Sequence, residues 1–233
     1  MKKSAIVAAA VIMLSQSAYA AEFTDTNGHW AQRDISRLSD KGIINGMGDG
    51  SFYPEGDVTR AQYLKMMMEA VKIPAADYRA GECLDTTAAD WYGPYLQSAL
   101  DKGLIPQDMI VGYKAVIDIE RNEAGESVGA SVKYSGAFNG NVAITREEAA
   151  YMTMALCQYT LNANTMTKLD EVNKELMFAD ENDISSWALP SVWLAASNGI
   201  INGMEDGSFQ PSGTTTRAQA AVMINRLLLK LGE

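Results

Sequence analysis

The sequence predicts a mainly α-helical protein built from repeated helix–turn–helix units. The stretch GIINGMGDGSFYP at residues 42–54 returns as GIINGMEDGSFQP at residues 199–211, with eleven of thirteen positions identical. Apolar residues around these stretches, such as Ile35, Leu38 and Met67, recur with a helical period. Because one helix pair cannot bury its own apolar stripe, we expect several units to pack on one another.

The two clear copies keep the same internal spacing. Trp30 is followed by Gly42, Asp49 and Arg60 at 12, 19 and 30 residues, and Trp187 by Gly199, Asp206 and Arg217 at the same distances. Upstream, Phe23-Thr-Asp25 corresponds to Phe178-Ala-Asp180. The glycines Gly42 and Gly199 are expected to end the first helix of each unit.

A third copy, diverged from the other two, lies between them. It has Asp85, Trp91 and Gly103 at the expected spacing, but Pro106-Gln107 replaces Asn-Gly. The repeat pattern resumes only with Thr145-Arg146, the expected start of the second helix, about 25 residues later than in the other copies. The surplus alternates apolar and polar residues around Asn122-Glu-Ala-Gly125, which predicts a β-hairpin of residues 110–119 with 127–134.

We therefore expect three units and one inserted segment. The units span residues 21–73, 83–162 and 176–233, with the insertion at about 107–143. Residues 1–20 have a positive start, a short apolar run and Ala18-Tyr19-Ala20, which is typical of a cleaved signal peptide. No later apolar run is long enough to span a membrane.

Each second helix begins with a capping signature. Thr59-Arg-Ala-Gln62, Thr145-Arg-Glu-Glu148 and Thr216-Arg-Ala-Gln219 all place Gln or Glu three residues after Thr. The arginine in each is unexplained by capping, because a cation in the first turn opposes the helix dipole by roughly 0.3–1 kcal/mol. Two readings stay open: an ion pair with Asp25, Asp85 or Asp180, or contact with an external anion beside the helix N-terminus.

The tryptophans and the turn also leave two readings each. Trp30, Trp91 and Trp187 are either core aromatics or platforms for sugar rings. The turn lacks the context of a dinucleotide loop, and Met47 stands where a calcium loop needs a ligand, so we expect neither cofactor nor metal. Gly46 and Gly203 are the turn positions where a ligand would approach the backbone most closely.

The two cysteines occupy corresponding slots of the middle unit. Cys83 stands at the place of Phe23, and Cys157 at the place of Val71. If these slots face each other, Cys83 and Cys157 form a disulfide, which export permits.

Charge and composition exclude some function classes. The net charge is −10, so the chain lacks the basic surface that nucleic-acid binding needs. A single histidine leaves little scope for histidine-dependent catalysis. Carboxylates are plentiful, but no pair stands outside the repeat, so we expect no enzyme of the two-carboxylate glycosidase type.

These motifs together resemble the S-layer homology domain. The family pattern, roughly F-x-D, W-A, G-I-I-x-G-x-x-D-G-x-F-x-P and T-R-A-[EQ], is met twice in full and once in part. The resemblance implies a mostly helical pseudo-threefold trimer of units whose grooves bind cell-wall glycans, often pyruvylated secondary polysaccharides. The positions that line the ligand in the family correspond here to Asp25, Trp30, Gly46 and Arg60, to Asp85, Trp91 and Arg146, and to Asp180, Trp187, Gly203 and Arg217.

The resemblance implies a secreted, non-catalytic anchor on the bacterial cell wall or S-layer surface. The expected partner is an anionic, pyruvylated polysaccharide, with peptidoglycan as the alternative. The insertion is a candidate site for a protein partner. Because Gln107 replaces the turn glycine in the middle unit, the grooves are not expected to be equivalent.

Overall fold

The computed structural model describes residues 23–79, 83–160, 168–169, 171–172 and 177–233. The expected signal peptide lies outside these residues. The described part contains six α-helices and one two-stranded sheet, so the mainly α prediction is confirmed. The elements in chain order are α1 (Gln32–Asp40), α2 (Arg60–Ala70), α3 (Gly93–Asp101), η1 (Gln107–Met109), β1 (Val111–Arg121), β2 (Ser127–Ala137), α4 (Arg146–Thr160), η2 (Glu181–Asp183), α5 (Leu189–Ser197) and α6 (Arg217–Leu231).

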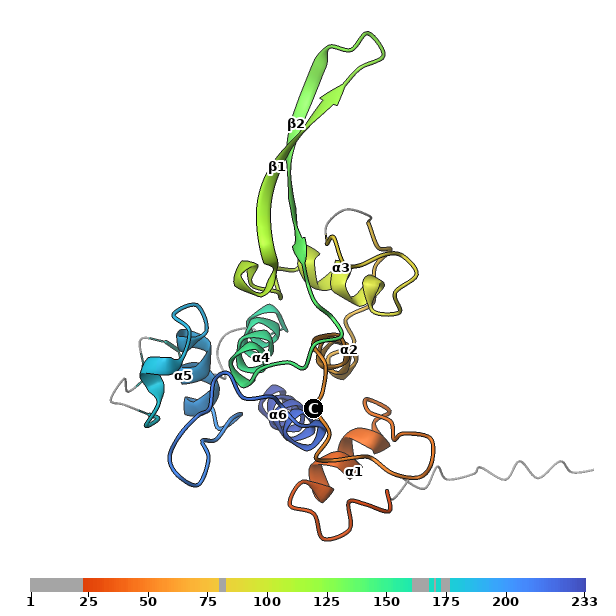
Figure 1. Ribbon diagram of the computed structural model, residues 1–233. Coiled ribbons are helices and arrows are strands. Elements are labelled where there is room, and N and C mark those ends of the chain that lie inside the picture. Colours follow the sequence, from red (N-terminus) through yellow and green to blue (C-terminus); the bar gives the residue numbers. More distant parts are fainter. Residues whose placement is uncertain (1–22, 80–82, 161–167, 170, 173–176) are drawn as a thin grey trace, which may run out of the picture.

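Three helices, one from each third of the chain, form the centre of the body. Helices α2, α4 and α6 contact one another in all three pairs (Figure 1). The fully buried Tyr63 of α2 places its hydroxyl 2.6 Å from Oγ1 of Thr153 on α4 and 4.0 Å from the sulfur of Met223 on α6. This contact gives a buried hydroxyl the partner that it needs inside an apolar core.

The chain thus has three segments, at residues 23–79, 83–160 and 177–233, each with one outer and one central helix. The outer helices surround the centre, and each covers the central helix of the preceding segment. Helix α3 packs on α2, α5 packs on α4, and α1 closes the ring by packing on α6 (Figure 1). Asn225 of α6 donates to Asp34 of α1 at 2.5 Å, and Arg37 donates to the carbonyl of Glu233 at 2.7 Å. The two helices of one repeat, α1 with α2, α3 with α4 and α5 with α6, are therefore not the main packing pairs.

The segments just before the central helices are joined by a closed triangle of backbone hydrogen bonds. The N–H of Val58 donates to Thr215, that of Thr215 donates to Ile144, and that of Ile144 donates back to Val58, each at 3.0 Å. Because each segment makes these bonds only with the other two, we expect the three to unfold in one cooperative transition.

The start of each central helix is fully capped. In α2, Arg60 and Ala61 donate their N–H groups to carbonyls of Val142 and Gly140, and Thr59 and Gln62 form the predicted capping box. Helices α4 and α6 repeat this arrangement with carbonyls of residues 213 and 211, and of residues 56 and 54. The N–H groups at these three starts already have partners within the chain, so an external anion beside them would have to be held by the arginine side chain and not by the helix terminus.

The hairpin prediction is confirmed, and the structure shows its origin. Strands β1 and β2 pair antiparallel, with Ile117 opposite Val132, and the Asn122-Glu-Ala-Gly125 turn joins them. In the first segment Met47 donates to the carbonyl of Ser51 across a tight turn, and Val111 and Ala137 form the corresponding pair at the root of the hairpin. The hairpin is therefore the glycine turn extended outward, and it projects well beyond the helical body (Figure 1).

Candidate functional site

Three predicted site residues, the aspartates near the segment starts, hold the turn that precedes each central helix. Asp25 accepts hydrogen bonds from the backbone N–H groups of Phe52 at 2.8 Å and Tyr53 at 2.7 Å. The same two bonds join Asp180 to Phe209 and Gln210, and Asp85 to Phe138 and Asn139. Desolvation opposes the charge on Asp25, but these backbone bonds outweigh it and lower the pKa of this carboxyl.

These aspartates also hold a strained backbone. Tyr53, Gln210 and Asn139 have φ of 61°, 58° and 54°, in the left-handed region that few residues other than glycine adopt. A carboxylate that accepts two consecutive N–H groups stabilises this conformation. The aspartates are thus positioning residues for the turn.

Phe138 is a structural residue that the sequence reasoning missed. It was assigned to the insertion, yet Asp85 binds its N–H as Asp25 binds that of Phe52. The signal was present in the sequence, since Phe52, Phe138 and Phe209 each lie seven residues before the capping threonine. All three rings are fully or almost fully buried.

The two turn glycines are explained by internal packing. A Cβ on Gly46 would lie 2.5 Å from the ring of Phe23 and 2.5 Å from the carbonyl oxygen of Ser51. A Cβ on Gly203 would lie 2.8 Å from the carbonyl oxygen of Ser208 and 3.0 Å from the ring of Phe178. The 2.5 Å contacts at Gly46 and the 2.8 Å contact at Gly203 are shorter than real Cβ contacts, and the 3.0 Å contact with Phe178 is tighter than most. A side chain at either position would therefore force the turn or the phenylalanine ring to move.

The same contact explains why the predicted disulfide is wrong. Cys83 and Cys157 are both buried, but they do not lie at disulfide distance. The slot of Phe23 faces the glycine turn of its own segment, where Phe23 also packs 5.3 Å from Phe52 between ring centroids. The premise that this slot faces the end of the second helix does not hold.

The arginines reach into the following segment. Arg146 of α4 donates from Nε to the carbonyl of Phe209 at 2.7 Å and from Nη2 to that of Asn202 at 3.2 Å. Arg217 of α6 makes the same contacts with Phe52 at 2.9 Å and Asn45 at 3.0 Å, and so closes the ring. Each guanidinium also lies over a phenylalanine ring, at 5.0 Å for Arg146 and 4.5 Å for Arg217.

Neither of these two arginines is paired with a carboxylate in the described part of the chain. Asp180 and Asp25 are near enough to favour the charged forms electrostatically, but burial has the larger effect and lowers the pKa of both Arg146 and Arg217. Each site therefore holds a poorly solvated cation. Its partners are backbone carbonyls, and no carboxylate of the described residues is bound to it.

Arg60 differs from the other two. Its guanidinium donates to the carbonyl of Phe138 and forms a two-point ion pair with Glu148 of α4, with Arg60 Nε 3.0 Å from Glu148 Oε2. Glu148 is the capping-box residue of α4, where α2 and α6 have Gln62 and Gln219. The ion-pair reading of the sequence thus holds at one position only, with Glu148 in place of the expected aspartate.

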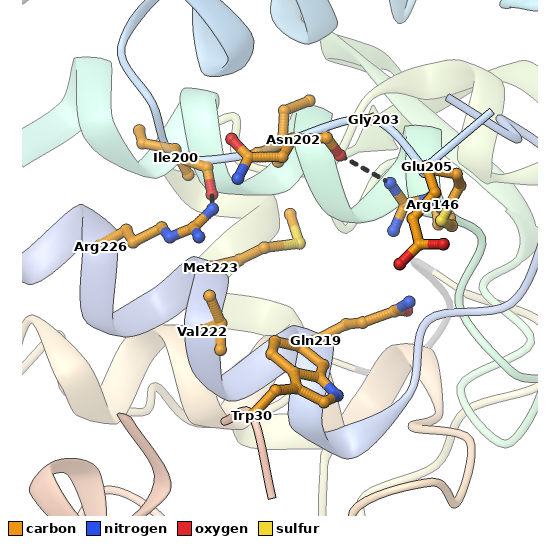
Figure 2. A pocket seen from close by; sticks show the side chains of 12 residues that line it. Trp30, Arg146, Ile200, Asn202, Gly203, Glu205, Gln219, Val222, Met223 and Arg226 are labelled. Carbon is orange, nitrogen blue, oxygen red and sulfur yellow. Dashed lines mark hydrogen bonds between the residues drawn. The ribbon is translucent and has the colours of Figure 1, made fainter. Parts of the chain in front are cut away.

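The α6 pocket lies between α6, the turn after α5 and the loop before α1, and its volume is about 430 Å³. Trp30 stands on one side and the backbone of Ile200 to Gly203 on the other, while Arg146 and Glu205 lie at one end (Figure 2). Val222 and Gln219 of α6 form the floor. Trp30 is 61% exposed, which excludes the core-aromatic reading at this position.

The corresponding α4 site is occupied by the protein itself. Tyr151 takes the place of Val222, and its ring packs edge-on against Trp187 with centroids 5.6 Å apart. Trp187 is therefore half-buried against the core, as the core-aromatic reading predicted. A smaller cavity of about 290 Å³ remains farther along α4, lined by Tyr159, Lys102 and Ser191 among others.

The α2 site has intermediate features. Trp91 is 51% exposed, and Gly48 stands where the α6 pocket has Glu205. Lys65 takes the place of Val222 and lies 5.9 Å from the ring centre of Tyr95 on α3. With Arg217 at its turn, this site combines an exposed tryptophan and an unpaired cation as the α6 pocket does.

Comparison with known proteins identifies the class of the two clear copies. The S-layer homology domain model matches residues 22–64 and 178–221. Domains of this family bind cell-wall polymers and anchor proteins to the cell envelope. The matched segments contribute the turns and tryptophans of the α2 and α6 sites.

Individual relatives are large proteins. The chain is 31% identical to an amylopullulanase of Thermoanaerobacterium thermosulfurigenes over 92% of its own length but 10% of that enzyme. It is 32% identical to the exoglucanase XynX of Acetivibrio thermocellus over 89% of the chain and 16% of the enzyme. It is 23% identical to the S-layer protein EA1 of Bacillus anthracis over 84% of the chain and 19% of that protein.

The chain thus spans at most about a fifth of these relatives, and it aligns with a part that glycosidases and surface-layer proteins share. The family match and the surface-layer relatives indicate a cell-surface, cell-wall-associated protein. Among the helices of the described residues, none combines the length and apolarity required to cross a bilayer.

Proposed function

We propose that this chain is a non-catalytic anchor that binds an anionic cell-wall glycan in the α6 pocket and at the α2 site. The single observation that carries the proposal is the pairing of an exposed tryptophan with a desolvated arginine that lacks a carboxylate partner. An indole face suits the C–H face of a sugar ring, and a guanidinium suits a carboxylate. A pyruvylated sugar presents both features on one residue.

The middle segment is, in this proposal, a third and diverged S-layer homology unit. Asp85 holds Phe138 as the other aspartates hold their turns, and α4 repeats the capping and the arginine of α2 and α6. It contributes to both proposed sites, because it supplies Arg146 to the α6 pocket and Trp91 to the α2 site, while its own site is filled by Tyr151.

The lining of the α6 pocket favours binding over catalysis. A two-carboxylate glycosidase needs an acid and a second carboxylate that flank one bond, about 5–9.5 Å apart. Glu205 is the one carboxylate among the residues that line this pocket. A purified chain mixed with cell-wall sacculi is therefore expected to bind without releasing reducing ends.

The test is co-sedimentation with purified walls before and after removal of their acidic secondary polysaccharide. We expect binding to need the polysaccharide, and Trp30→Ala to weaken it about tenfold, which corresponds to about 1.4 kcal/mol. Arg146→Ala is expected to weaken it as much, with circular dichroism to check its folding. Leu229→Ala, which removes an exposed apolar side chain of α6 outside the pocket, is the matched control.

Two outcomes would redirect the proposal. Undiminished binding to walls stripped of the polysaccharide would assign the ligand to peptidoglycan. Wild-type binding by folded Trp30→Ala and Arg146→Ala variants would exclude the α6 pocket. Because the contacts are short-ranged and partly buried, we also expect binding to survive moderate salt.

A further inference from the structure

Beyond its root the hairpin has two open edges; at the root, Leu84 donates its N–H to the carbonyl of Gly136 of β2 at 2.7 Å. Strands β1 and β2 pair only with each other, and among the described elements the closest neighbour of β1 is the short η1 at its root. Figure 1 shows most of the ribbon beyond the helical body. An isolated two-stranded hairpin is marginally stable in water, and an unpaired edge is a template for a further strand.

The register divides the hairpin into two unlike faces. Ala115 pairs with Tyr134, Ile117 with Val132 and Ile119 with Ala130, so these apolar positions share one face of the ribbon. The charged positions of Lys114, Asp118 and Glu120 fall on the other face. Ile119 is 48% exposed and Val128 62% exposed, so this ribbon leaves apolar surface uncovered.

The sequence of β1 is complementary to itself in antiparallel orientation. If two copies of β1 pair about a twofold axis at Ile117, the position of Lys114 falls opposite Glu120 of the other copy, and Ala115 falls opposite Ile119. Opposite charges and apolar residues then meet across the strands in two symmetric sets, while Val116 falls opposite Asp118 between them. Strand β2 offers no such match, because Lys133 would fall opposite Ser131 about Val132.

We propose that a second copy of this chain adds its β1 to this β1, which makes a four-stranded antiparallel sheet in the order β2–β1–β1–β2. The apolar faces of the two hairpins then lie on the same side of one sheet. The antiparallel orientation places the two helical bodies at opposite ends of the sheet. This proposal is independent of glycan binding, since the hairpin contributes no residue to the α6 pocket.

Sedimentation velocity of the full chain tests the proposal. We expect a concentration-dependent dimer, and Glu120→Lys to weaken it at least tenfold, because it sets lysines against Lys114 of the other copy twice. The charge-swapped double variant Lys114→Glu with Glu120→Lys is expected to restore it. Lys133→Glu, the matched charge reversal on β2, is expected to leave the dimer unchanged.

A cysteine on the axis gives a second readout. In the proposed dimer, residue 117 of one chain lies opposite residue 117 of the other. Ile117→Cys should therefore form an intermolecular disulfide under mild oxidation, whereas Val132→Cys on β2 should not. A monomeric wild type up to about 100 µM overturns the proposal. Failure of the charge swap to restore the dimer, or cross-linking through residue 132, assigns the contact to another face and also overturns it.

Discussion

The α6 pocket and the α4 site are built on the same kind of capped central helix but differ in their side chains and in the turn beside the helix, which the hairpin replaces at α4. Both have a tryptophan, an arginine from the preceding segment and a capped central helix. In the α4 site Tyr151 replaces Val222, and Glu148 replaces Gln219 and pairs with Arg60. The comparison teaches that the capped helix start is kept because the three segments bond to one another there. Two side chains, Tyr151 and Glu148, are enough to close a site.

The buried ion pair of the α4 site gives the largest expected effect. Arg60→Ala leaves Glu148 buried without its partner, and loss of one partner typically costs about 3–5 kcal/mol of unfolding free energy. Urea denaturation measures it. The double variant Arg60→Met with Glu148→Gln should recover most of the loss, because the glutamine keeps the capping box seen in α2 and α6. A double variant as unstable as the single one would contradict the pair's role.

Adding a single methyl group at the turn glycine Gly203 should destabilise the protein. Gly203→Ala forces a methyl group against Phe178 and the carbonyl of Ser208, which we expect to lower the free energy of unfolding by about 1–3 kcal/mol. Thermal unfolding measures the change. In the double variant with Phe178→Cys, which copies the middle segment, the added cost of the alanine should shrink. Equal costs in both backgrounds would show that the ring contact is not the cause.

Exchanging one floor residue should exchange the properties of the two sites. Val222→Tyr should fill the α6 pocket, shield Trp30 and weaken wall binding about tenfold, or about 1.4 kcal/mol. The converse Tyr151→Val should expose Trp187 and shift its fluorescence to longer wavelength. Wall co-sedimentation and tryptophan emission check the two halves. Unchanged binding by Val222→Tyr would separate the pocket from the activity.

The aspartate that holds the first turn should make stability depend on pH. The pKa of Asp25 is lowered in the folded state, so its contribution is present above the ordinary value of 3.8 and is lost as the pH falls through the lower folded value. Asp25→Asn should cost about 1 kcal/mol at pH 7. The difference from wild type should narrow below about pH 3.8. Denaturant titrations at several pH values measure it, and a constant difference would contradict it.

The smallest expected effect distinguishes the α6 pocket from the α2 site. Glu205 lies at the α6 pocket near Arg146, where a carboxylate disfavours an anionic ligand, while Gly48 takes its place at the α2 site (Figure 2). Glu205→Gln should therefore tighten binding of an acidic wall glycan by about two- to fivefold, within the range of one exposed charge contact. Weaker binding would instead make Glu205 a ligand contact.

Much of the architecture could be predicted from the sequence, and the reasons are local. The capping boxes at Thr59 and Thr216, the hairpin around Asn122, and the helical periods all depend on contacts within a few residues. The unequal middle segment was also visible, because Gln107 and the missing turn interrupt a strict repeat.

The partners of the site residues could not be predicted, because they come from other segments. Arg146 binds carbonyls 56 and 63 residues away, and Trp30 completes a pocket on α6 at the far end of the chain. The disulfide prediction failed for the same reason, because the position of Cys83 or Cys157 within the repeat does not reveal which residues its side chain contacts. Phe138 was missed because the hairpin separates it from the turn that it closes.

The sequence by itself determined that three helix pairs exist, where each second helix begins and that a hairpin interrupts the middle segment. Only the tertiary structure decided that each helix packs on the preceding segment and that α1 closes the ring on α6. The physical reason is that caps and periods are properties of a few neighbouring residues, whereas the triangle of Val58, Ile144 and Thr215 exists only when all three segments have met.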